Sequence, residues 1–218
     1  AHVFAAVRAA GWQEGLCFTA PAGQMTGVLG PPGGGIEQVM ALAAGALRPE
    51  DGRILLGGAA LAAGPVAVAG QGVACCARHP RAIAGMTVLE QAMTGGFLHR
   101  GGFWASLAGR RAERPLASQV HDLLALVGLV ARAEEPAVRL RQAELWRLEL
   151  ARAMAARPRL LLLEAPAAAL RPADSAALGG LLRGLCAAGL TVLVGEHNMG
   201  FVAAQCDHAV VLHRGRKL

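Results

Sequence analysis

The chain has 218 residues, of which 54% are hydrophobic and only 4% aromatic, and its formal net charge is +6. This length fits one domain with a substantial core. The basic charge does not indicate a nucleic-acid partner, because the arginines are scattered and no aromatic side chains alternate with them to stack on bases.

Cysteine usage and hydropathy argue against two further classes. The five cysteines are odd in number and show no CxxC spacing, which argues against a disulfide framework or a zinc site. Residues 54–77 carry no charge and are long enough to cross a bilayer, but glycine and proline interrupt them repeatedly. We interpret this stretch as a strand, a turn and a second strand. No charged-then-apolar leader opens the sequence, so we expect a cytoplasmic protein that reaches a membrane only through a partner.

In chain order, residues 1–10 are ambiguous between strand and loop, and a short strand is expected at 16–19. A buried strand at 25–29 leads into a glycine-rich loop, and a helix follows at 37–47. This order is typical of a phosphate cradle, in which backbone N–H groups and a helix N-terminus converge on an anion. In the P-loop pattern G-x-x-x-x-G-K-[ST], Gly30 and Gly35 have the required spacing. Ile36, however, replaces the lysine, and Glu37 replaces the hydroxyl residue.

Strands are expected again at 53–56 and 73–77, after which the pattern becomes helical. Thr87 and Glu90 are spaced as a capping box at a helix start. A basic loop or linker at 101–111 separates this helix from two amphipathic helices at 120–129 and 143–156.

The last third of the chain alternates buried strands with helices. An apolar strand at 160–163 ends in Glu164, and another at 190–194 leads to His197. Helices are expected at 172–188 and 198–204, and a final strand at 209–212. The alternation predicts an α/β fold with a parallel, P-loop NTPase-like sheet. We expect one domain, with a helical subdomain at about 79–157 inserted between core segments at about 1–78 and 158–218.

Several longer motifs accompany the glycine loop in a fixed order. They are RPxxGRI at 48–54, GMTVLE at 85–90, LELARA at 148–153, LLLL at 160–163 followed by Pro166, LTVL at 190–193 and EHNM at 196–199. Together they resemble the nucleotide-binding subunit of an ABC transporter over nearly the whole chain, and most of all the branched-chain amino-acid importer type.

This resemblance implies a site for ATP and Mg²⁺, with roles assigned by position. His197 matches the switch histidine and Glu164 matches the carboxylate that holds Mg²⁺, so these two are the catalytic candidates. The residues expected around the nucleotide are Gly30, Pro31, Gly33, Gly34, Gly35, Ile36, Glu37, Gln38 and Arg78.

The chain departs from the family pattern at several of these positions. Ile36 cannot donate to phosphate, and Ala165 stands where the family has the glutamate that polarises the attacking water. Arg78 replaces a glutamine, and the signature motif at 140–144 lacks its serine and glycine. Loss of one charge-assisted hydrogen bond costs roughly 1.5–3 kcal/mol. We therefore expect impaired or absent ATP hydrolysis.

The resemblance also implies partners. They are the permease subunits of a transporter, expected to dock around residues 78–105, and a second ATPase subunit in a homo- or heterodimer. The implied location is the inner face of the cell membrane. Two alternatives stay open: a subunit that still binds ATP and supports transport beside a competent partner, and a non-catalytic scaffold or decayed pseudo-ATPase that does not bind nucleotide. The transported substrate is a property of other subunits.

Overall fold

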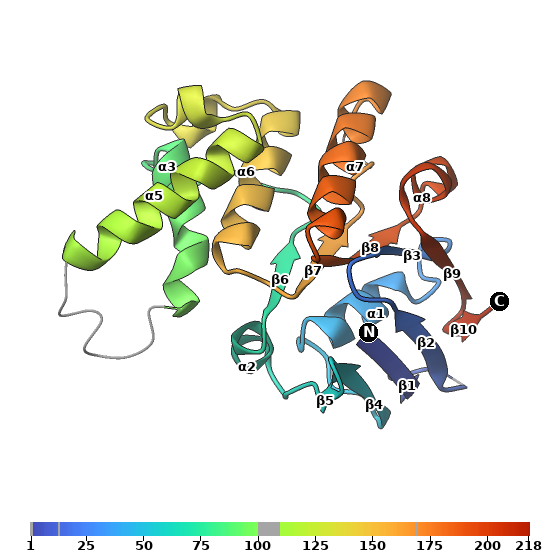
Figure 1. The fold of residues 1–218 in the computed structure, drawn as a ribbon. Coiled ribbons are helices and arrows are strands. Elements are labelled where there is room, and N and C mark those ends of the chain that lie inside the picture. Colours follow the sequence, from blue (N-terminus) through green and yellow to red (C-terminus); the bar gives the residue numbers. More distant parts are fainter. Residues whose placement is uncertain (1, 13, 100–109, 169) are drawn as a thin grey trace. The chain divides into compact units, whose positions relative to one another are not determined.

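The computed structural model describes residues 2–12, 14–99, 110–168 and 170–218 (Figure 1). Two compact units make up the chain. The first, called the sheet unit below, comprises residues 1–78 and 159–218, and the second, the helical unit, comprises residues 79–158. In the described part of the chain, no helix combines the length and the apolar character needed to cross a membrane.

A six-stranded sheet forms the centre of the sheet unit. Its order is β10-β9-β3-β8-β7-β6, and all neighbours are parallel except β10, which pairs antiparallel with β9. The strands are β3 (Met25–Leu29), β6 (Val73–Cys76), β7 (Leu160–Glu164), β8 (Thr191–Glu196), β9 (His208–His213) and β10 (Arg216–Lys217). Every residue of β3 and β8 is buried, as expected of strands covered on both faces. The predicted α/β fold is confirmed.

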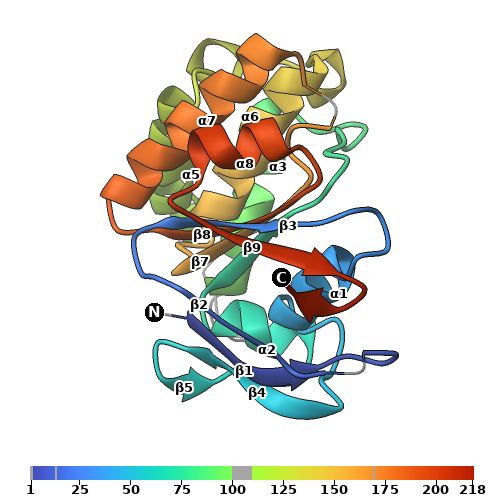
Figure 2. The ribbon, with the colours of Figure 1, turned by 90° about the vertical axis from the view of Figure 1, so that its right-hand side faces the viewer.

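Helices cover both faces of this sheet. Helix α1 (Ile36–Ala43) packs on one face, and α7 (Pro172–Ala187) and α8 (Met199–Gln205) pack on the other (Figure 2). Two strand glycines permit the close approach: a Cβ at Gly27 would lie 2.6 Å from a methyl group of Val202 in α8, and one at Gly195 would lie 2.7 Å from Ile36 in α1. The segment at 37–47 was expected to stop being helical near Gly45, and α1 does end there, because Gly45 adopts φ 71° and reverses the chain.

A second, antiparallel sheet of order β2-β1-β4-β5 belongs to the same unit. Its strands are β1 (His2–Arg8), β2 (Leu16–Ala20), β4 (Asp51–Leu56) and β5 (Ala59–Ala60). Phe4 of β1 stacks on Phe18 of β2 with ring centroids 4.2 Å apart. The strand–turn–strand interpretation of 54–77 is wrong in its middle, where α2 (Pro65–Gly70) forms because Pro65 stands in the first helical turn.

The helical unit contains α3 (Val88–Met93), α5 (Arg110–Leu126) and α6 (Gln142–Ala155), which pack side by side (Figure 1). The described part of this unit also contains the 3₁₀ helices η1 (Thr94–His99), η2 (Val130–Arg132) and η3 (Ala137–Arg139). The capping box is confirmed, since Thr87 Oγ1 accepts from Glu90 N at 3.1 Å and Glu90 Oε2 accepts from Thr87 N at 2.8 Å.

One boundary in the helical unit was predicted wrongly. Helix α5 begins at Arg110, ten residues before the predicted helix start at 120, because residues 110–115 continue the helix without adding apolar residues to its periodic pattern. The part of the predicted basic loop at 101–109 lies outside the described residues.

Candidate functional site

The glycine loop between β3 and α1 has the backbone of an anion cradle. Gly33 and Gly35 adopt φ 73° and φ 113°, which other residues rarely reach. A Cβ at Gly30 would overlap the carbonyl of Leu212, and one at Gly34 would lie 2.8 Å from the Pro31 carbonyl oxygen. All four glycines are therefore required by the shape of the loop.

The loop keeps several backbone donors free. Gly34 N donates to Pro31 O at 2.8 Å, but the N–H groups of Gly33 and Gly35 have no acceptor within the described residues. The first N–H groups of α1 lack intrahelical partners because of their position. Together these donors form a partial anion site that needs no side chain.

Ile36, at the lysine position, belongs to the hydrophobic core. Its side chain is only 3% exposed and packs toward β8, where Gly195 leaves room for the methyl group at Cγ2. The structure therefore uses this position for packing between α1 and the sheet. No positive charge is supplied to the cradle from here.

Glu37 and His197 face one another beside the loop. His197 Nδ1 lies 2.8 Å from the Gly30 carbonyl oxygen, and because a carbonyl only accepts, Nδ1 carries the hydrogen. His197 Nε2 lies 3.6 Å from Glu37 Oε1, so the two attract one another as ions only when the imidazole is protonated. Gln38 follows in α1, and its Oε1 is buried without a hydrogen-bond partner in the described part of the chain. A carboxylate thus stands next to the cradle.

The carboxyl end of β7 provides one exposed carboxylate and no second one. Glu164 is the last residue of β7, and its side chain makes no hydrogen bond or ion pair to other described residues. Ala165 is buried, adopts φ 45° and donates its N–H to Gly195 O at 2.7 Å. A non-glycine residue in this conformation is uncommon. Its buried methyl group offers no base for a water molecule.

Arg78 follows β6, the strand next to β7, with its side chain partly buried. Carboxyl ends of parallel strands lie at one edge of a sheet, so Arg78 and Glu164 share that edge. The described residues give Arg78 no hydrogen bond or ion pair, and none joins it to the glycine loop. The structure therefore brings Gly30, Glu37 and His197 together and leaves Arg78 and Glu164 outside their hydrogen-bond network.

Glu196 is the organising residue that sequence reasoning missed. It is 1% exposed, and its carboxylate accepts three backbone N–H groups, from His197 at 2.8 Å, Asn198 at 3.1 Å and Ala167 at 2.9 Å. These bonds tie the loop after β7 to the loop after β8 and place the His197 ring beside Gly30. The sequence signal that could have identified Glu196 is its position two residues after the apolar run that ends at Val194.

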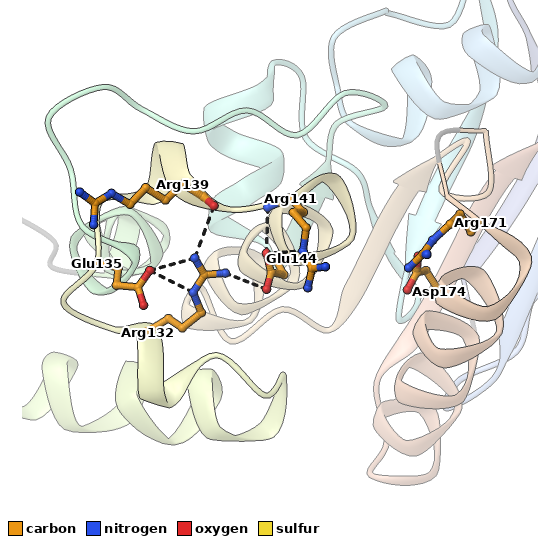
Figure 3. Close-up of polar contacts among 7 residues, drawn as sticks. All are labelled: Arg132, Glu135, Arg139, Arg141, Glu144, Arg171 and Asp174. Atoms are coloured by element: carbon orange, nitrogen blue, oxygen red, sulfur yellow. Dashed lines mark hydrogen bonds and ion pairs between the residues drawn. The ribbon is translucent and has the colours of Figure 1, made fainter.

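In the helical unit, a side chain in the first turn of α6 binds groups around the start of that helix (Figure 3). Glu144 Oε2 accepts the Arg141 N–H at 2.8 Å, and Glu144 Oε1 lies 2.7 Å from Arg132 Nη1. Arg132 also binds Glu135 at 2.8 Å. A carboxylate in the first turn already compensates the helix dipole, so this helix end is not prepared for an anionic ligand.

These contacts shift the pKa values of Arg132 and Glu144. Hydrogen bonds to Glu135 and then Glu144 raise the pKa of Arg132. Burial by itself would raise the pKa of Glu144, but the Arg141 N–H and the Arg132 guanidinium outweigh it and lower this pKa to about 2. Arg171 and Asp174 make a similar, more exposed pair at the start of α7, with Nε and Oδ2 2.8 Å apart (Figure 3).

Comparison with known proteins gives a consistent result. Residues 14–168 match the family model described as ABC transporter. The chain is 32% identical to the high-affinity branched-chain amino acid transport ATP-binding protein BraF of Pseudomonas aeruginosa, over 89% of this chain and 79% of BraF. LivG of Escherichia coli, of the same description, is 31% identical over the same shares.

Other relatives belong to importers of other substrates. The methionine import ATP-binding protein MetN of Thermobifida fusca is 32% identical over 93% of this chain, but the chain spans only 61% of MetN. Among solved structures, a nucleotide-free ATP-binding cassette from an ABC transporter matches 100% of this chain and 89% of its own, with a TM-score of 0.86 and 20% identity. The ADP conformation of the ATP-binding cassette MJ1267 has the same TM-score of 0.86, at 19% identity. These structures show a shared fold.

The packing of Ile36 on Gly195 gives a first prediction. Gly195→Ala places a methyl group 2.7 Å from Ile36 Cγ2 and 2.9 Å from Met40 Cγ. We expect the free energy of unfolding, measured in urea, to fall by about 1–3 kcal/mol because of overpacking. Gly180→Ala in α7, where the added carbon meets no neighbouring group, is the control and should lose no stability. Combined with Ile36→Ala, the loss should be less than the sum of the two single losses, and additive losses would contradict this packing.

The Glu144 cluster predicts a pH dependence. Because the pKa of Glu144 falls from about 4.5 to about 2 on folding, its contribution is present above the higher value and lost as pH drops toward the lower one. Glu144→Gln should therefore be less stable than the natural chain near neutral pH, with the difference shrinking in acid. Glu134→Gln, an exposed neighbour, is the control and should change stability little at any pH. A Glu144→Gln effect that stays constant down to acid pH would rule out the ion pair as its cause.

Proposed function

Because this chain belongs to the ABC transporter family, as the ATP-binding subunit of an importer, we propose that it serves a branched-chain amino-acid importer with impaired or absent ATP hydrolysis of its own. The likeness to BraF and LivG supports the substrate class. Permease subunits and a second ATPase subunit are the proposed partners, and the proposed location is the cytoplasmic face of the membrane.

The main support for the proposal of impaired ATP hydrolysis is the burial of Ile36. A lysine at this position would bring a positive charge to the phosphates, whereas Ile36 is 3% exposed inside the core. The loss of that contact alone weakens binding by roughly ten- to a hundred-fold. Glu37 adds a negative charge beside the cradle, and Ala165 supplies no base.

The residues present therefore fit Mg-ATP only in part. The free N–H groups of Gly33 and Gly35 suit a phosphate oxygen. Glu164 is an oxygen donor of the kind that Mg²⁺ accepts, but no cluster of three or more potential metal ligands occurs among the residues that the structure describes. The residues do not fit a catalytic Mg-ATP complex, and we derive no hydrolytic step through it.

The proposal of impaired hydrolysis can be tested by introducing the lysine, the hydroxyl residue and the glutamate that this chain lacks. The triple variant Ile36→Lys, Glu37→Thr, Ala165→Glu should bind Mg-ATP at least about tenfold more tightly than the natural chain in calorimetric titrations. The natural chain should turn over Mg-ATP much more slowly than this variant or not at all. Turnover by the natural chain as fast as that of the triple variant would refute the proposal, provided that it disappears in His197→Ala, which excludes a contaminating ATPase.

Because a buried lysine can prevent folding, a second variant avoids the core. Glu37→Gln changes a side chain that is 51% exposed and removes only its charge. This variant should bind tripolyphosphate several-fold more tightly than the natural chain, measured by calorimetry at low salt. Equal affinity would show that Glu37 does not oppose phosphate binding. Absence of any binding, even in the restored and folded triple variant, would favour a scaffold that binds no nucleotide.

The substrate class is tested in cells. Removal of this chain from its natural host should lower uptake of labelled leucine, isoleucine and valine and leave methionine and ribose uptake unchanged. The last two are chosen because other relatives carry those import functions in their names. A selective loss of methionine or ribose uptake would contradict the assignment. Complementation with Gly180→Ala is expected to restore uptake, because that exposed change leaves the fold intact.

A further inference from the structure

A cavity of about 250 Å³ lies in the sheet unit between the C-terminal end of α1 and the hairpin formed by β4 and β5. Its apolar lining includes the buried side chains of Leu42 and Ile54 and the partly buried Leu61. Leu47, which also lines the cavity, is 41% exposed. The cavity therefore offers an apolar lining with an opening to solvent.

Two arginines, Arg48 and Arg53, supply all the charge that lines this cavity. Neither makes a hydrogen bond or ion pair in the described part of the chain. The acids of the intervening turn are directed elsewhere: Glu50 Oε2 lies 3.8 Å from Arg8 Nε, and Asp51 Oδ1 accepts the Gly52 N–H at 2.8 Å. Two guanidinium groups are therefore left without a carboxylate from the protein.

We propose that this cavity is a second ligand site, which binds a small carboxylate with a branched aliphatic body. Guanidinium groups recognise carboxylates through paired hydrogen bonds, while the leucine and isoleucine side chains receive the aliphatic part. The volume lies below the roughly 300–1,000 Å³ of sites for drug-sized ligands, so the ligand is small. No acidic side chain lines the cavity, so an α-ammonium group finds no partner and free amino acids bind less well.

The site is distinct from the phosphate cradle and does not rest on the proposed function. The cradle precedes α1, whereas Leu42, near the last residue of α1, lines the cavity. A ligand here is in contact with the helix that begins at Ile36.

The test uses the full chain and isocaproate, the simplest branched aliphatic carboxylate of suitable size. Titration followed in ¹H–¹⁵N spectra should give saturable shifts concentrated at residues 42–54 and 60–63. Isohexanol, which has the same body without the charge, and leucine, which adds an ammonium group, should bind at least about tenfold more weakly. No saturable shift at millimolar isocaproate, or equal binding of the alcohol, would overturn the proposal.

Single arginine variants test whether Arg48 and Arg53 bind the carboxylate. Arg48→Gln and Arg53→Gln should each raise the Kd for isocaproate about tenfold or more, because each removes a charge-assisted hydrogen bond. Both side chains belong to exposed residues, so the fold should tolerate the changes. Arg81→Gln, an exposed arginine of the helical unit that does not line the cavity, is the control and should leave the Kd unchanged. An unchanged Kd in either cavity variant would overturn the assignment.

Discussion

A carboxylate buried in a protein interior must be compensated, and Glu196 meets this requirement entirely through backbone donors. The three N–H groups come from two loops at the same edge of the sheet, so the compensation fixes both loops at once. His197 follows directly and is thereby held against the Gly30 carbonyl. The arrangement of the candidate site thus depends on Glu196, a residue that is itself buried.

Contacts within the protein also occupy Ile36 and Glu144, two residues at positions that the sequence comparison with the family singled out. At the lysine position, Ile36 serves the core; at the start of α6, Glu144 binds Arg132 and the Arg141 backbone. Both side chains therefore interact with other parts of the protein. The backbone of the cradle has kept its shape, because glycines at 30, 33, 34 and 35 are demanded by local conformation and contacts. The backbone of the loop therefore keeps its shape without a lysine at position 36.

Much of this architecture was predictable because its signals are local. Glycine spacing located the loop, the Thr87–Glu90 pair located a helix start, and apolar runs located the parallel strands. Other features depend on distant partners. The burial of Ile36 is explained by Gly195, and the role of Glu196 by Ala167, neither of which is near in sequence. Helix α2 was missed because its short sequence, PVAVAG, gave no helical periodicity, although Pro65 marked its start.

The cradle is also completed from far along the chain. Gly34 O accepts the Gly215 N–H at 2.9 Å, and the Leu212 carbonyl packs so closely on Gly30 that no larger residue would fit. During synthesis, β3 and α1 leave the ribosome long before these partners exist. A loop rich in glycine has high conformational entropy until something restrains it. The phosphate loop should therefore become ordered among the last events of folding, as a contact of high sequence separation closes over it.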